Sequence, residues 1–208
     1  TVSLKAGNIE IEAKYSEYGE LLVLCEGIKG AGFFICNSCG HGETHRPKEV
    51  QHYTPFGREC HSPRIENYRL GHKFTTDILI LNLKNYTKPN EKMDDSFNYS
   101  FLYGLIAGAS YTLGIQERDL DGCIFFQNHE PNFVIFDNVP GGAGHVKRFI
   151  KETNFSQIIN NTLKILEQCS CGLETSCNSC LRNYRNQIYH DILKRGTIIE
   201  FLKTNLTN

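Results

Sequence analysis

The hydrophobic and polar positions follow two patterns, with short strand-like runs early in the chain and helical spacing later. Residues 21–25 and 33–36 are apolar runs separated by a glycine-rich break, which predicts two strands joined as a hairpin. Residues 76–83 form a longer β-compatible run and predict a buried strand. Two more strands are predicted at residues 122–127 and 133–137.

Helical spacing begins near residue 96, after a polar linker at 84–95. Ser96 is a suitable N-cap, apolar residues recur every three or four positions from Phe97, and Gly114 suits the C-terminal end. Gly104 and Gly108 would let this helix pack closely against a neighbour. Further helices are predicted from 145, at 156–167, at 181–189 and at 191–202. The pattern predicts an α/β (α+β) fold, with a mixed sheet packed by helices.

Composition and length suit a folded, soluble protein. The 208 residues are 40% hydrophobic, which is enough to bury a core. We expect a β-rich segment over residues 1–70 and a second domain over 71–208. The sequence shows no signal peptide or membrane-spanning run, and it starts at Thr1, not Met. We therefore expect a cytoplasmic segment of a larger protein that does not contact a membrane.

Four of the nine cysteines lie within twelve residues: Cys169, Cys171, Cys177 and Cys180. Such spacings close strained disulfide rings but wrap readily around a tetrahedral zinc ion, and a Cys₄ site leaves no position for a catalytic water. We expect a structural zinc knuckle here, in a reducing compartment. An iron–sulfur cluster uses the same ligands and is an alternative, as are four reduced cysteines without a metal.

A second metal-binding segment is predicted at residues 36–61, which otherwise lack a periodic pattern. Its expected zinc ligands are Cys36, Cys39, His52 and Cys60, a Cys₃His set. His41, His45 and His61 compete with His52 for the fourth position. In the alternative, Cys36 ends a buried strand and the histidines are solvated. Cys25 and Cys123 lie in apolar runs and are expected to be core residues.

A glycine-rich turn at residues 137–145 joins a predicted strand to a predicted helix. Gly141, Gly142 and His145 would place backbone N–H groups at a helix N-terminus, where phosphate can bind. Close strand–helix packing explains the glycines equally well. Asp77, Asp137 and His145 also suggest an alternative function, a metal-dependent nuclease or hydrolase, if they meet in an open pocket.

Basic residues concentrate near the C-terminus, although the net charge is only −1. Residues 145–208 hold nine basic and five acidic side chains. Arg182 and Arg185, three apart on the predicted helix, would face one phosphate strand, with Asn186 and Gln187 adding amide hydrogen bonds. In the alternative, these residues hydrogen-bond within the domain.

Several of these motifs together resemble the MrfA-type zinc-binding domain. The matching residues are 71–77, the 136–145 turn, the four-cysteine cluster, and 180–187 with His190 and Leu193. Domains of this family lie C-terminal to helicase cores of the DEAD/DEAH-box type and at the end of DrmB proteins of the DISARM phage-defence system. The resemblance implies that Cys169, Cys171, Cys177 and Cys180 bind zinc and that the domain accompanies machinery acting on DNA.

We therefore expect a non-catalytic, zinc-binding accessory domain with a role in DNA repair or antiviral defence. Its expected partners are DNA and a helicase domain or subunit. The sequence holds no Walker motif, so an ATPase would belong to the rest of the parent protein or to a partner. The alternatives are the hydrolase above and a module that binds only proteins.

Overall fold

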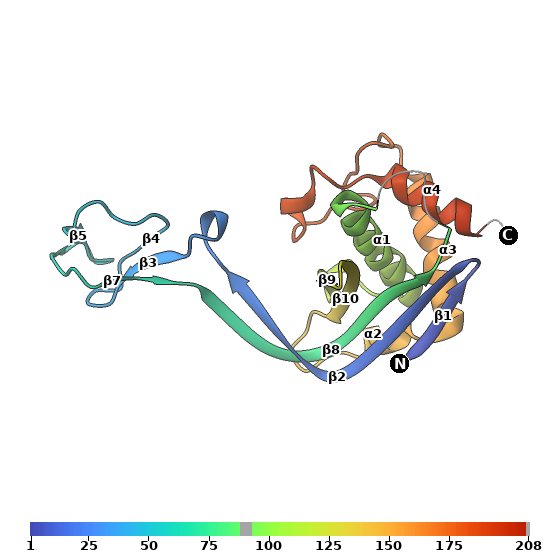
Figure 1. The fold of residues 1–208 in the computed structure, drawn as a ribbon, viewed down its shortest axis with the longest axis horizontal. Coiled ribbons are helices and arrows are strands. Elements are labelled where there is room, and N and C mark those ends of the chain that lie inside the picture. The colour runs from blue at the N-terminus through green and yellow to red at the C-terminus, as the bar shows by residue number, and fades with distance from the viewer. Residues whose placement is uncertain (88–92, 207–208) are drawn as a thin grey trace. The chain divides into compact units, whose positions relative to one another are not determined.

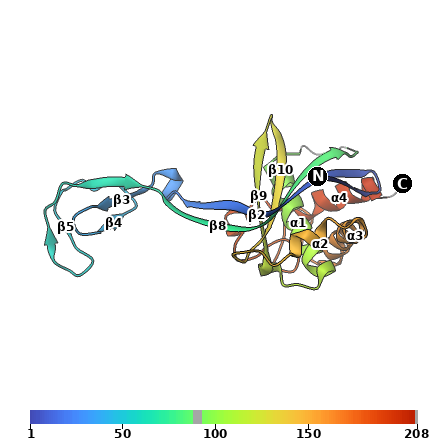
Figure 2. The ribbon, with the colours of Figure 1, turned by 90° about the horizontal axis from the view of Figure 1, so that it is seen from below.

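The computed structural model describes residues 1–87 and 93–206, so the polar linker expected at 84–95 lies partly outside the described residues. The chain divides into two compact units, one made of Thr1–Gly19 with Thr75–Asn208 and the other of Glu20–Phe74. The ribbon is drawn in Figures 1 and 2.

Most strands precede the helices along the chain and the sheets are paired antiparallel, an α+β arrangement that confirms the expected class. The strands are β1 (Val2–Ala6), β2 (Ile9–Cys25), β3 (Phe33–Cys36), β4 (Gly42–Glu43), β5 (His52–Tyr53), β6 (Glu59–Cys60), β7 (Ile65–Tyr68), β8 (Leu70–Asn85), β9 (Leu120–Gln127) and β10 (Glu130–Asp137). The helices are α1 (Asp95–Leu113), α2 (His145–Phe149), α3 (Glu152–Gln168) and α4 (Arg195–Leu206), with 3₁₀ turns at Ile28–Gly30, Glu117–Asp119 and Gln187–Tyr189.

The larger unit is built on a five-stranded sheet with the order β1-β2-β8-β10-β9. The β1–β2, β8–β10 and β9–β10 pairs are antiparallel. Ile9, Ile11 and Ala13 alternate with polar residues along β2 and are fully buried, as expected for a strand with one face on a core. In Figure 1, α1, α3 and α4 lie together in this unit, and α3 packs on β1 and on both other helices.

Helix α1 is central to this core and is buried on nearly every side. Its N-cap is Asp94, whose side chain accepts from the Phe97 N–H, while Ser96 donates its hydroxyl to Ile192 O at 2.6 Å. The predicted Ser96 cap is therefore wrong, because that hydroxyl bonds a distant segment. The predicted C-terminal glycine is confirmed, since Gly114 is left-handed with φ 66°.

The expected close approach along α1 is also confirmed. A Cβ at Gly108 would collide with the Thr162 hydroxyl and lie 2.7 Å from Ile158 O, both on α3. Thr162 donates to Gly104 O at 3.1 Å, a bond between the two helices. Glycine at these positions therefore lets the α1 and α3 backbones meet.

The smaller unit contains a three-stranded sheet ordered β4-β3-β7 and a β5–β6 pair. Because β2 and β3 belong to different sheets, the hairpin predicted for residues 21–36 is wrong. The break between them holds a 3₁₀ turn and three glycines with positive φ, Gly27, Gly30 and Gly32. The conformations of these glycines change the direction of the chain after β2, so that β3 joins a different sheet and does not pair with β2.

The structure divides the chain differently from the expected boundary after residue 70. The first nineteen residues belong with the C-terminal part because β1 and the start of β2 are buried in the same core as the helices. The smaller unit is thus a single segment of the chain, from the last part of β2 to the first part of β8. Among the described residues, every helix is too short or too polar to cross a membrane.

Two predicted C-terminal helices differ from the structure. Residues 181–189 form an irregular loop that ends in one 3₁₀ turn, and α4 begins at Arg195, four residues after the expected start at 191. Gly196, expected to weaken α4, lies in its first turn, where a Cβ would be 2.8 Å from Leu173 O. Glycine there permits the four-cysteine segment to approach the helix.

Candidate metal centre

The C-terminal cysteine cluster brings four sulfur atoms together directly after α3. The Sγ–Sγ distances are 3.4 Å for Cys169–Cys171, 3.3 Å for Cys169–Cys177, 3.8 Å for Cys171–Cys180 and 3.9 Å for Cys177–Cys180. Four sulfurs at the usual zinc–sulfur distance of ~2.3 Å in a tetrahedron are ~3.8 Å apart. All four cysteines are free thiols, so the cluster fits a zinc ion and contains no disulfide.

Backbone hydrogen bonds within the cysteine segment hold the ligands of this cluster close together. The N–H groups of Cys180 and Arg182 both donate to Cys177 O, forming a tight turn between the last two ligands. The backbone N–H of Ser179 points at the Cys177 thiol and lowers its pKa to about 7. A thiolate is the form that binds zinc, so the turn favours the ligating state of Cys177.

Arg195 ties the cluster to the helical core. Its guanidinium is buried and donates to Leu166 O at 2.8 Å and twice to Cys171 O, so it joins the end of α3 to the cysteine segment. The backbone N–H groups of Arg195 and Gly196 donate to Thr175 O and Leu173 O. These carbonyls satisfy amides that the first turn of α4 leaves without helical partners.

The second cluster lies in the smaller unit and has the predicted composition. The ligand atoms of Cys36, Cys39, His52 and Cys60 lie within 4.8 Å of one another, and Cys39 Sγ is 3.3 Å from His52 Nε2. Although burial opposes it, N–H groups of Ser38 and Cys39 hold the pKa of Cys36 at about 6. Three thiols and one imidazole form a donor set typical of structural zinc.

The ring orientation of His52 explains why this histidine completes the cluster. Its Nδ1 is 2.7 Å from Val50 O, and a carbonyl only accepts, so Nδ1 carries the proton. The Nε2 lone pair is then free to face Cys39 and a metal. The competing histidines have other neighbours: His41 contacts Glu43, His45 contacts Thr44, and His61 contacts Glu59.

The glycine-rich turn is folded around carboxylates of the protein itself. Asp137 is fully buried and accepts from the N–H groups of Ala143, His145 and Val146, and Asp77 accepts from Gly144 N–H at 3.1 Å. The N–H groups of Gly141 and Gly142 donate to Thr75 O and Val139 O. The amides predicted to bind phosphate are therefore already bonded.

The same contacts argue against the hydrolase alternative. Asp77 and Asp137 do approach one turn, but both carboxylates bond backbone amides, and Asp137 has no exposed surface. His145 contributes its backbone N–H to this arrangement. The required open pocket is absent at Asp137, and the pair acts as a backbone scaffold.

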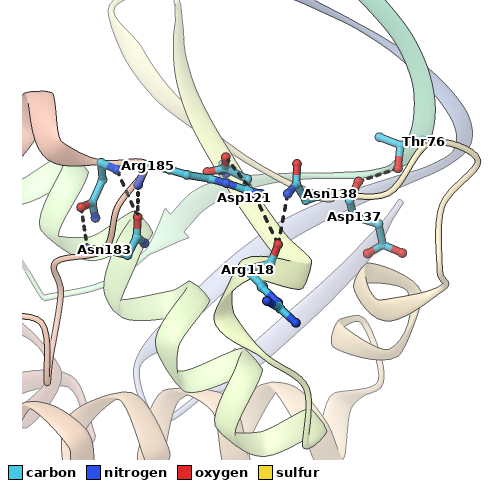
Figure 3. A network of polar contacts seen from close by, with 9 residues as sticks. Thr76, Arg118, Asp121, Asp137, Asn138, Asn183 and Arg185 are labelled. Carbon is cyan, nitrogen blue, oxygen red and sulfur yellow. Dashed lines mark hydrogen bonds and ion pairs between the residues drawn. The ribbon is translucent and has the colours of Figure 1, made fainter.

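The predicted basic residues are not arranged on one helix face. Arg182 donates to Ser176 Oγ, Thr175 Oγ1 and His190 O, so its guanidinium closes the loop after the cluster. Arg185 lies 3.6 Å from Asp121 and donates to Arg118 O; Figure 3 shows this contact. The two guanidiniums serve different internal contacts, in agreement with the alternative of hydrogen bonds within the domain.

Asn186 and Gln187 have contrasting surroundings. Asn186 is fully buried, donates to Leu181 O and accepts from Asn183 N–H at 2.8 Å, so it has a structural role in the loop. Gln187 is exposed. Of the four residues predicted to bind nucleic acid in this segment, Arg185 and Gln187 remain accessible.

Sequence reasoning missed two residues that the structure makes prominent. Arg195 could not be assigned because its acceptors lie 24 and 29 residues away in the chain. Tyr184, four residues after Cys180, is 87% exposed, and its place between two arginines was the available signal. Cys25 and Cys123, expected in the core, are exposed and belong to neither cluster.

Comparison with known proteins identifies the domain that holds the C-terminal cluster. Residues 101–181 match the model of the MrfA Zn-binding domain, a range that includes all four cysteines. The Druantia protein DruE of Escherichia coli (strain UMEA 4076-1) is 26% identical over 196 residues, covering 79% of this chain and 10% of DruE. The chain thus spans about a tenth of that relative's length.

Two solved structures also resemble the chain. The DUF1998 helicase MrfA bound to DNA has a TM-score of 0.46 and 15% identity, covering 95% of this chain and 26% of that one. MrfA bound to DNA and AMPPNP has a TM-score of 0.39 and 12% identity, covering 61% and 20%. The family match over residues 101–181 by itself confirms the resemblance seen in the sequence, because this part of the chain matches the MrfA Zn-binding domain.

Proposed function

We propose that the chain is a non-catalytic, zinc-stabilised accessory domain that helps a helicase-associated or phage-defence protein engage DNA. The observation that carries this proposal is the four-cysteine cluster, whose sulfur geometry fits zinc and whose backbone is bonded to the helical core through Arg195. The match of residues 101–181 to the MrfA Zn-binding domain supports the same role. A DISARM-type parent protein remains part of this proposal.

A closed site explains why the metal would be structural. Cys169, Cys171, Cys177 and Cys180 supply four thiolates, so zinc bound here would have no position left for water. Bound zinc would link the end of α3 to the loop before α4. Metal binding of this kind contributes directly to folding free energy.

The accessible residues after the cluster support contact with DNA. Tyr184, Arg185 and Gln187 are exposed and lie within seven residues of Cys180. Cations and amides of this kind bind phosphate oxygens, and an exposed aromatic ring can stack on bases. Zinc would therefore hold the segment that presents these groups.

A salt titration tests DNA engagement. The zinc-loaded chain should bind a fluorescent single-stranded oligonucleotide, and log K should fall with log salt by about 0.7 per phosphate contacted. Binding that ignores salt, or no binding at 50 mM salt, would contradict the proposal. Zinc analysis of the same sample keeps loss of metal from being mistaken for a lack of affinity.

A second candidate function, docking of a partner protein, is favoured by an apolar surface in the smaller unit. Leu22, Val23 and Leu24 of β2 are each more than half exposed, and Leu70 of β8 is 49% exposed. Exposed apolar surface of this kind marks many interaction sites. A chain that binds zinc but no DNA would leave this function as the better account.

A further inference from the structure

The loop after the cysteine cluster faces the Glu117–Asp119 turn across two adjoining cavities in the larger unit. One has a volume of about 270 Å³ and the other about 770 Å³. Glu117, Asn183 and Tyr184 line both. The smaller cavity also has an apolar lining from Ile106 and Leu120, and its size suits one ring system better than a folded partner.

Tyr184 is a large exposed aromatic side chain on a firmly held backbone. The Arg185 and Asn186 N–H groups both donate to Asn183 Oδ1, and Asn186 Oδ1 accepts from the Asn183 N–H. His190 Nε2 lies 2.9 Å from Asn186 Oδ1, closing the network. An aromatic ring presented by an ordered loop loses little entropy when a ligand stacks on it.

The charges around the cavities are balanced. The lining contains Arg118, Arg182 and Arg185, opposed by Glu117, Asp121 and Asp191. Asp121 forms an ion pair with Arg185, as Figure 3 shows. The Arg118 guanidinium points away from Asn138 and Arg185, which donate to the Arg118 carbonyl. Burial raises the pKa of Glu117, so its carboxyl lies in a partly desolvated position. Such a surface offers both cationic and acceptor groups to a ligand.

The two adjoining cavities form one groove that shares Glu117, Asn183 and Tyr184. We propose that this groove binds one unpaired base of a DNA single strand, with Tyr184 stacked on the base. Asn183 and Glu117 would meet the polar edge of the base. A base exposes its face in this way only when it is not stacked in a duplex, so the groove should prefer single strands. The inference rests on the proposed DNA function and assigns its contact site.

The chain contains no tryptophan, which makes a direct test possible. Tyr184→Trp would introduce a single indole at the stacking position. In the zinc-loaded 208-residue protein, its emission should be quenched by the single strand dC10 and much less by a ten-base-pair duplex. Equal quenching by the duplex would overturn the preference for an unpaired base.

Affinity measurements on three further variants complete the test. Tyr184→Ala should weaken dC10 binding roughly 5- to 100-fold, the loss expected for one base–aromatic stack, while Tyr184→Phe should retain most of the affinity. Tyr111→Ala is the matched control, because Tyr111 is also exposed, at 62%, and lines neither cavity. Thermal melting of each variant would confirm that the fold is kept.

These measurements test the assignment of the groove separately from the proposed DNA-binding function. If the wild type binds dC10 and Tyr184→Ala binds equally well, the groove assignment fails and the DNA function stands. If the wild type binds neither dC10 nor the duplex, both fail. Weakening of Tyr184→Ala to the same extent as Tyr111→Ala would also overturn the assignment.

Discussion

At the residue scale, Arg195 does most to connect the metal centre to the fold. It forms no ion pair with a carboxylate among residues 1–87 and 93–206, and its guanidinium donates to carbonyl oxygens of Leu166 and Cys171. A zinc ion with four thiolates carries a net charge of −2, so a buried cation nearby also offsets charge. This side chain should therefore affect stability and zinc affinity together.

Arg195→Met should lower the free energy of unfolding by about 2 to 4 kcal/mol, because it removes charged hydrogen bonds and leaves buried carbonyls unpaired. Urea denaturation of the zinc-loaded protein measures the loss, and competition with a chromophoric chelator measures zinc affinity. Lys84→Met is the matched control, since Lys84 forms an exposed ion pair with Glu12, worth about 0 to 1 kcal/mol. Equal effects of the two variants would contradict the role of Arg195.

The glycine-rich turn allows a second comparison between neighbouring residues. Gly141 and Gly142 both have positive φ, 89° and 76°, but a Cβ at Gly142 would lie 2.6 Å from Asp77 Cγ, whereas a Cβ at Gly141 would have no atom within 4 Å. Gly141→Ala should cost about 1 to 2 kcal/mol from backbone strain alone. Gly142→Ala should cost more because it also displaces Asp77.

Thermal or urea unfolding of both variants checks this order. A Gly142→Ala variant as stable as Gly141→Ala would show that Asp77 does not hold the turn. The role of this turn could not be predicted from the sequence, because its glycines suit phosphate binding and close packing equally well. In the structure, Asp77 and Asp137 accept hydrogen bonds from the turn's amides, which favours packing over phosphate binding.

At the element scale, the contact between α1 and α3 should limit which substitutions the domain accepts. Gly108→Ala would place a methyl group against Thr162 and Ile158, and we expect a loss of about 2 kcal/mol or more from overpacking. Gly104→Ala is the control, because its Cβ would be 3.2 Å from Thr162 Cγ2, and alanine's helix propensity offsets about 1 kcal/mol. Similar melting temperatures for both variants would contradict the close packing.

The elements also show where sequence reasoning succeeds and fails. The sequence from Phe97 to Gly114 predicted α1 because it is a long, mostly apolar segment that ends at a capping glycine, although a helix buried on nearly every side has only a weak amphipathic period. Leu181, Arg182 and Arg185 suggested a helix as well, yet Asn183 and Asn186 bond the backbone locally and hold a loop. Asparagine side chains compete with helical hydrogen bonds in this way, and a period alone does not reveal it.

At the scale of the whole molecule, both predicted metal ligand sets come together in space, one in each compact unit. Short spacings made the C-terminal set predictable, since its ligands are two to six residues apart in the chain and must lie near one another. In the other set only Cys36 and Cys39 are that close, and the residue types of the segment indicated His52 and Cys60. The division of the chain was less predictable. The pairing of β1 with β2 and the burial of Ile9 and Ile11 place the N-terminus with the C-terminal helices, a long-range arrangement that local patterns do not encode.

The zinc content of the purified chain, measured by mass spectrometry of the metal, tests the central claim most directly. We expect two zinc ions per chain in the wild type, one in Cys177→Ser, one in Cys60→Ser, and two in the control Cys25→Ser, whose thiol is exposed and in neither cluster. Well under one zinc per wild-type chain, or an unchanged content in Cys177→Ser, would contradict the account.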